Sequence, residues 1–281
     1  MTYAPPTGIG VGIDLWSVKF FPLNTDGTIN APGYPVAATT PYEGLELGKA
    51  KTLQPNLGAS RTIPVIAQGR VQTTFILPPT DAKTAELHLA YIDLEVFAAL
   101  SKVKTRTIGG ARGMAAGTNK QGLELSGALL VSQLQFHTDD GLDAWHSYLF
   151  PRVKAAVTWP AFNENPIDVT VMMSLSSAKT HLWGTALTEG TDGATEFALW
   201  PFQSWGLPNI VAWVADGSED TFLLPADAQA NDTFADTFKV YDSTAGTGTP
   251  VTGTPSASQF VAGSPPTTDH VLLGWYEQVE G

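Results

Sequence analysis

The sequence predicts a mainly β protein: a β-sandwich or barrel-like fold with one or two short flanking helices and long loops. Two observations lead to this prediction. The 281 residues include 27 Gly and 20 Pro but only 15% charged residues, a composition typical of many turns between strands. Segments in which apolar and polar side chains alternate also recur along the chain.

The alternating segments define the expected strands. In chain order they are residues 14–21, 61–77 with an interruption at Gly69, 86–92, 123–136, 153–159, 167–175, 210–215, 234–241 and 270–278. All are rich in the β-branched, leucine and aromatic side chains that pack well on a sheet. Between the first two, Asn24-Thr-Asp-Gly27 is a turn signal.

Two short segments instead show helical spacing. Asp93 can cap a helix over residues 94–100, in which apolar residues return every three or four positions. Residues 139–150 repeat this pattern, with Leu142, Trp145 and Leu149 on one face and Pro151 as the expected stop. Asp139 and Asp140 suit the positive N-terminal end of such a helix.

The chain is expected to form one elaborated β domain, with two independent domains as the alternative. Residues 243–269 are low in complexity and rich in turn residues, which favours a long loop or flexible excursion. Residues 270–279 are apolar enough to return to the core. We therefore divide the chain into a β domain at 1–216, an acidic turn-rich insertion at 217–269, and a final strand within 270–281.

Charge is divided unequally along the chain. Residues 1–154 hold 13 basic against 12 acidic side chains, a net of +1, whereas residues 155–281 hold 2 basic against 15 acidic, a net of −13. Within the first part, residues 102–120 carry five cations and no carboxylate: Lys102, Lys104, Arg106, Arg112 and Lys120. Opposite signs on one molecule permit head-to-tail self-association. The alternative interpretation is that this glycine-rich loop is cationic for solubility alone.

Several classes of function lack their residues. The chain has no cysteine, which excludes thiolate nucleophiles and Cys-ligated zinc. Its net charge of −12 argues against general nucleic-acid binding, and no apolar run approaches the roughly 20 residues of a membrane-spanning helix. A cluster of His137, Asp139, Asp140 and His146 is the best candidate for a cation site, but helix capping explains it more simply. We expect no metal, no cofactor and no secretory signal.

Two further classes remain open. Eight tryptophans could stack on sugar rings, as in a carbohydrate-binding or adhesin-like β-sandwich, although Trp213 and Trp275 have apolar neighbours and fit a core better. A hydrolase with a carboxylate pair is the enzyme alternative, because glycosidases need only two acids across a groove. The chain contains no Gly-x-Ser-x-Gly elbow or P-loop, and we expect it not to be an enzyme.

The order of the expected elements resembles that of the major tail proteins of long-tailed bacteriophages. The similarity starts with a strand near Gly12-Ile-Asp-Leu-Trp-Ser-Val-Lys-Phe, a pair at 45–53 and 61–77, and a strand running into a short helix at 87–100. It continues through a long hairpin, a second small helix, a corner at Trp159-Pro-Ala-Phe and a last strand ending in Trp-Tyr-Glu. The resemblance covers most of residues 9–216 and the last strand, but not residues 217–269.

This resemblance implies a tail-tube fold that assembles into stacked, hexameric rings around a channel for DNA ejection. The implied partners are further copies of the chain and the tape measure, tail terminator and distal tail proteins. DNA would pass without tight binding, since cations in the wall would hold phosphates. The protein would reside in the virion tail, and in the host cytoplasm before assembly, without membrane contact. A virion decoration protein is the related alternative.

Overall fold

The described part of the protein consists of β-strands and the segments that join them. The computed structural model describes 19 strands in five sheets, and no helix lies among the residues it describes. Those residues are 10–24, 27, 29, 41–47, 50–58, 61–67, 70–77, 83–90, 104–115, 125–137, 143–157, 169–178, 203–205, 209–226, 239–242, 249–256 and 258–276. The mainly β fold predicted from composition and alternation is confirmed.

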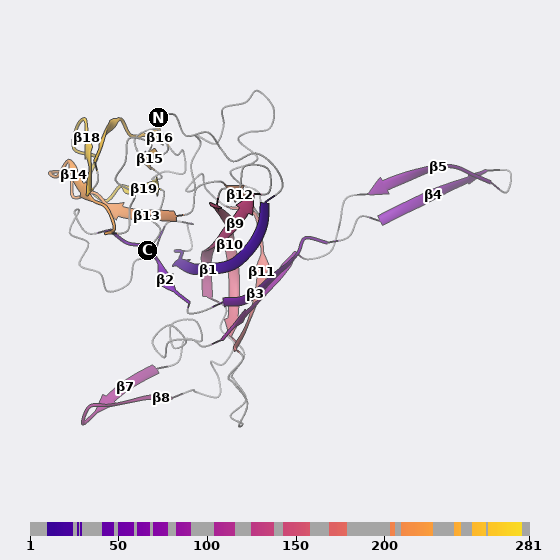
Figure 1. The fold of residues 1–281 in the computed structure, drawn as a ribbon, viewed down its shortest axis with the longest axis horizontal. Coiled ribbons are helices and arrows are strands. Elements are labelled where there is room, and N and C mark those ends of the chain that lie inside the picture. Colours follow the sequence, from indigo (N-terminus) through magenta and orange to yellow (C-terminus); the bar gives the residue numbers. More distant parts are fainter. Residues whose placement is uncertain are drawn as a thin grey trace.

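An antiparallel sheet of eight strands forms the body of the protein (Figure 1). In spatial order its strands are β2 (Leu45–Glu46), β1 (Gly10–Pro22), β9 (Leu125–His137), β10 (Asp143–Val157), β11 (Val169–Leu175), β6 (Thr84–Leu89) and β3 (Ala50–Asn56), with β12 (Gln203–Trp205) beside β10. Residues of β3, at one end of this order, also contact β1 near the other end. The sheet therefore curls on itself like a barrel.

The inside of the curled sheet holds the first apolar cluster. Alternate residues of a strand face the same side of a sheet, so each strand sends one set of side chains inward. Fully buried members are Phe20 of β1, Val131 of β9, Phe150 of β10, Val171 of β11 and Leu87 of β6. Because these residues come from strands far apart in the chain, the cluster forms only when the sheet has curled.

A second sheet covers part of the outer face of the first. Its order is β13 (Asn209–Val214), β19 (Val271–Tyr276), β15 (Lys239–Asp242) and β16 (Thr249–Pro250). Phe21, Leu130 and Leu149 of the large sheet pack here in one buried cluster with Ile210 and Leu273. Residues 271–273 of β19 are buried on both faces of the second sheet. The sequence of β19 is therefore a continuous apolar run rather than an alternating pattern.

A third sheet packs on the other side of the second sheet. It contains β14 (Thr221–Leu223), β18 (Gln259–Ala262) and β17 (Gly253–Pro255), and its β14 and β18 lie at the edge of the molecule in Figure 1. Trp213 of β13 packs with Phe222 and Phe260 in a third cluster. The indole Nε1 of Trp213 donates a hydrogen bond of 2.8 Å to the carbonyl of Leu223. The protein thus has three layers.

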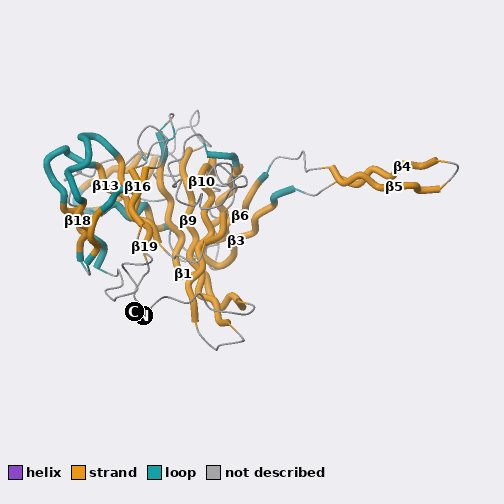
Figure 2. The backbone as a smooth tube through the Cα atoms, turned by 90° about the horizontal axis from the view of Figure 1, so that it is seen from above, coloured by secondary structure: helices purple, strands orange, loops and turns teal. Residues whose placement is uncertain are grey.

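Two hairpins leave these layers. One joins β4 (Arg61–Ala67) to β5 (Arg70–Leu77), the other joins β7 (Lys104–Ile108) to β8 (Ala111–Ala115), and each forms a two-stranded sheet of its own. We call β4–β5 the arm and β7–β8 the basic hairpin. Figures 1 and 2 both show the arm far from the body, and Figure 1 shows the basic hairpin projecting from another side.

Most of the expected strands are confirmed. Residues 14–21 lie within β1, residues 61–67 and 70–77 form the arm, and the other alternating segments overlap β6, β9, β10, β11, β13, β15 and β19. The turn at 24–27 is confirmed as well, because Gly27 donates a backbone hydrogen bond of 3.0 Å to Asn24 and has a φ of 97°.

The helix predicted over residues 139–150 is wrong. Residues 143–157 form β10, which pairs with β9, β11 and β12, while residues 139–142 lie outside the described part. Pro151, the expected helix stop, sits in the strand at the register shift between Phe150 and Val153. An irregularity of this kind tolerates a residue that has no backbone N–H to donate. The helix predicted after Asp93 lies outside the described residues.

The long loop predicted over residues 243–269 is also wrong in part. This segment contains β16, which belongs to the second sheet, and β17 and β18, which belong to the third. The chain division at 216 and 269 stays a prediction. In the structure β19 pairs on one side with β13, from within 1–216, and on the other with β15, from within 217–269.

Candidate functional site

The basic segment predicted as a loop forms a β-hairpin over residues 104–115. Its strands meet in the register Arg106 to Gly113 and Thr107 to Arg112. Gly109 and Gly110 make the turn with φ angles of 57° and 85°, values that other residues rarely adopt. Two successive residues with positive φ are typical of the type I′ turn, which matches the twist of paired strands. The loop conformation expected for this segment is therefore wrong for its central part, while its role in assembly or in solubility stays a prediction.

The structure places three of the five predicted assembly residues. Lys104 and Arg106 lie in β7, and Arg112 lies in β8 opposite Thr107. Lys102 and Lys120 lie outside the described residues. Arg106 is exposed, as are the neighbouring residues 107–111. An exposed cation on a projecting hairpin is available to a partner.

The sequence did not reveal the apolar character of the hairpin tip. Ile108 is 64% exposed, the largest exposure among the large apolar side chains of the described residues. It lies two residues after Arg106, and therefore on the same face of β7. Opposite these two residues stand only Ala111 and Gly113, which are too small to cover them. The hairpin thus presents a cation and an uncovered isoleucine side by side.

An acidic turn lies between β13 and β14. Oδ1 of Asp216 accepts hydrogen bonds from the backbone N–H groups of Ser218 at 2.8 Å and Glu219 at 3.0 Å, and from the Ser218 hydroxyl at 3.0 Å. These donors, the Ser218 backbone N–H first, lower the pKa of Asp216. Glu219 is exposed beside it, and Asp220 is half-buried. The turn therefore holds an ordered carboxylate in its charged form.

The acidic turn is tied to the segment that leads into β19. Thr268 donates its hydroxyl to the Asp216 carbonyl at 3.0 Å, and the backbone N–H of Asp269 donates to Ala215 at 2.7 Å. Nearby, Nδ1 of His270 lies 2.5 Å from Oδ2 of Asp242, which joins the start of β19 to the end of β15. These contacts fix the turn against the second sheet.

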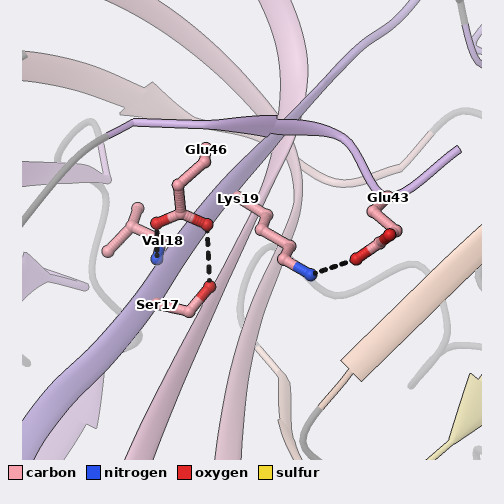
Figure 3. Close-up of polar contacts among 5 residues, drawn as sticks. All are labelled: Ser17, Val18, Lys19, Glu43 and Glu46. Carbon is pink, nitrogen blue, oxygen red and sulfur yellow. Dashed lines mark hydrogen bonds and ion pairs between the residues drawn. The ribbon is translucent and has the colours of Figure 1, made fainter. Parts of the chain in front are cut away.

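A second polar group lies where β2 meets β1 (Figure 3). Oε1 of Glu46 accepts a hydrogen bond from the Val18 backbone N–H at 3.3 Å, and Oε2 accepts one from the Ser17 hydroxyl at 3.1 Å. Beside them, Nζ of Lys19 lies 3.1 Å from Oε2 of Glu43. Strand β2 has only two residues, and a longer strand would have been needed to pair with the backbone N–H of Val18. The Glu46 carboxylate accepts that hydrogen bond instead.

Partial burial of the Glu46 carboxyl group among its neighbours is the largest influence on its pKa and raises it. Other parts of the residue stay exposed to water. The Val18 N–H, the Ser17 hydroxyl and Lys19 act in the opposite direction. The alternation of β1 gave no sign of this group, because Ser17 and Lys19 are polar residues that alternate with the apolar Val18 and Phe20. In the structure they are only 8% and 9% exposed. The group holds β2 and the residues before it against β1.

The predicted cation cluster does not come together in the described residues. His137 ends β9 and His146 lies in β10, whereas Asp139 and Asp140 lie outside the described part. The ring of His146 packs beside that of Tyr148, with centroids 5.0 Å apart. Within the described ranges no group of three or more His, Asp or Glu residues could hold a metal ion.

The sugar-binding alternative gains no support from the described aromatic residues. Trp213, which the sequence assigns to the core, is 1% exposed, and this assignment is confirmed. Among the residues whose side chains the structure describes, the exposed large apolar ones are Leu57, Ile108, Met172 and Leu223, none of them aromatic. The side chains of Trp16, Trp145, Trp205 and Trp275 lie outside that description.

No family model matches the chain, and no curated protein matches its sequence significantly. Among the described residues, none forms a helix of the length and hydropathy needed to cross a membrane.

Proposed function

We propose that this chain is a structural protein of a bacteriophage virion, and that its copies assemble into stacked rings that form the tail tube. The observation that carries this proposal is the arm. Among the described strands, β4 and β5 pair only with each other, and Figures 1 and 2 show them extended away from all three layers. An arm of this kind has no core of its own.

The physical argument rests on what such an arm lacks. A two-stranded hairpin is marginally stable in water, and its unpaired edges can pair with strands of other chains. The arm contains apolar residues that stand directly opposite one another, Ile63 with Phe75 and Ile66 with Val71. Further copies of the chain would cover these residues and the strand edges. A subunit that extends such an arm is suited to a polymer in which each copy grips its neighbours.

Charge supports a DNA conduit within that polymer. The net of −13 over residues 155–281 leaves little affinity for phosphates, so DNA would pass a wall of these residues without being held. Rings of six subunits, contacts with the tape measure, tail terminator and distal tail proteins, a place in the virion and the absence of enzymatic activity all belong to this proposal. They follow from the resemblance of the expected element order to that of tail tube proteins, although the second small helix of that order is replaced in the structure by strand β10.

The test is assembly with and without the arm. Residues 59–82 are replaced by a short Gly-Ser linker, since Asn56 and Thr84 are paired and their strands can be joined directly. Electron microscopy and sedimentation should show rings or tubes of the native protein and only small species of the variant. The variant should keep its melting temperature, because no described member of the three apolar clusters comes from residues 59–82. Native protein that forms no particles at any concentration would refute the proposal.

DNA retention provides a separate test of the conduit. Assembled native protein should retain duplex DNA no better than a typical non-specific binder, with a Kd of roughly 10⁻⁴ to 10⁻⁶ M at physiological salt. Tight retention by assembled tubes would mean that cations line the channel, and the conduit function would then be wrong even if tubes form.

A further inference from the structure

Two of the exposed apolar residues stand beside charges of opposite sign. Ile108 is 64% exposed and accompanies Arg106 on the basic hairpin. Leu223 is 44% exposed on β14, directly after the acidic turn at 216–220. Its neighbour Phe222 points into the third cluster, so Leu223 faces outward from the outermost sheet. Each surface therefore combines an uncovered aliphatic side chain with exposed charge.

The charges of the two surfaces are complementary over a wide stretch of chain. Residues 102–120 contain no carboxylate, and no Lys or Arg occurs between Lys179 and Lys239. The acidic turn contributes Asp216, Glu219 and Asp220, with Asp216 held in place by its hydrogen bonds. Complementary charge of this kind orients two surfaces as they meet, and the apolar contact then excludes water between them.

The two surfaces of one molecule cannot meet each other. Figure 1 shows the basic hairpin projecting below the body and β14 with β18 on its upper side. A contact between them must therefore join two molecules, and it leaves a free hairpin on one and a free acidic turn on the other. Such a head-to-tail contact can repeat indefinitely or close into a ring.

We propose that the basic hairpin of one copy docks on the acidic turn and β14 of a second copy, with Ile108 against Leu223 and Arg106 beside Glu219. This rests on the proposed self-assembly and adds to it the surface that receives the hairpin. One such contact buries little area and is weak on its own. It becomes effective when the arm and other contacts hold the same two copies together, because the second contact is then intramolecular.

The experiment is a charge-reversal cycle read by sedimentation velocity and microscopy. Arg106→Glu and Glu219→Arg should each weaken association by about tenfold or more, and the double variant should recover most of the loss. Ile108→Ser and Leu223→Ser should weaken it as well. Met172→Ser is the matched control, since Met172 is also 44% exposed but lies on β11, outside both surfaces. Melting temperatures of all variants should stay near that of the native protein.

The outcomes separate this inference from the proposed function. Tubes that form normally in all four single variants would overturn the docking contact and leave the tail-tube function standing. Weakening by the hairpin variants alone would also overturn it, because the hairpin would then have another receptor. If Arg106→Glu abolishes DNA retention and leaves association unchanged, the partner of the hairpin is a polyanion. Short oligomers that weaken in each single charge variant and recover in the double variant, but never form tubes, would support the contact and refute the tube. Native protein that never associates would refute both.

Discussion

The aromatic ring of Phe20 occupies the space that a side chain at Gly127 would need. A Cβ atom built on Gly127 would lie 2.1 Å from Cζ of Phe20, and neither residue can move freely because both are buried in paired strands, Phe20 in β1 and Gly127 in β9. We expect Gly127→Ala to lower the free energy of unfolding by roughly 1–3 kcal/mol, the usual effect of overpacking. Gly113→Ala is the control, since its Cβ would meet nothing closer than 3.9 Å. Chemical denaturation measures both, and equal stability of the two variants would contradict this account.

Glu46 should make stability depend on pH in a direction set by its raised pKa. The folded protein binds a proton on Glu46 at a higher pH than the unfolded chain, whose value is near 4.5. The contribution of Glu46 to stability is therefore fully present below that value and is lost as pH rises through the folded pKa. Glu46→Gln keeps an acceptor for Val18 and removes this loss.

The stability of Glu46→Gln relative to the native protein should consequently increase with pH above about 4.5, by less than about 1 kcal/mol because water screens an exposed carboxylate. Urea unfolding at a series of pH values measures the difference. A difference that shrinks as pH rises would show that hydrogen bonding, and not burial, dominates at this carboxylate.

Trp213→Phe should destabilise the contact between the second and third sheets. The substitution removes the 2.8 Å hydrogen bond to the Leu223 carbonyl and shrinks a buried ring, at a cost of roughly 1–4 kcal/mol. Leu223→Thr is the matched control, since it alters an exposed side chain and leaves the accepting carbonyl in place. Thermal unfolding should separate the two variants clearly, and a control as unstable as Trp213→Phe would rule out the hydrogen bond as the cause.

The turn of the basic hairpin should tolerate asparagine better than alanine. Replacing Gly109 and Gly110 by two alanines forces positive φ on residues that avoid it, so the hairpin should lose protection from hydrogen exchange while the melting temperature of the body stays unchanged. Gly109→Asn should keep the hairpin, because asparagine adopts this conformation readily. Equal protection in both variants would mean that contacts outside the turn determine the hairpin.

Local patterns predicted most of the strands, including β19, which is buried on both sides, but failed at the start of β10. In β10, Ser147 and Leu149 face the second sheet while Phe150 faces the first cluster, so no simple alternation appears. The three- and four-residue spacing of Leu142, Trp145 and Leu149 then imitated a helix. The pairing of β10 with β9 and β11 decides its conformation, and that pairing joins segments that no local window contains.

The candidate surfaces show the same limit. Charge counting along the chain located Arg106 and the acidic segment, because net charge is a property of composition. It could not locate Ile108 or Leu223 as exposed residues, since exposure depends on which neighbours a strand acquires. The small partners of Ile108 across the hairpin are visible only once the register is known. Likewise Lys19 could not be recognised as buried before β2 was seen to lie beside it.

The central place of β19 in the second sheet has a consequence for how the protein is made. Residues 271–276 follow both of their partner strands in the chain, and they supply Leu273 to one core and Leu272 to another. During synthesis β13 and β15 therefore emerge before the strand that joins them, and the second sheet cannot close over the curled sheet until residues 271–276 have been made. A nascent chain that has not yet reached Asp269 lacks the contacts that Thr268 and Asp269 make with the acidic turn. The second and third layers are therefore completed only after β19 has been made, and the acidic turn takes its final form at that stage.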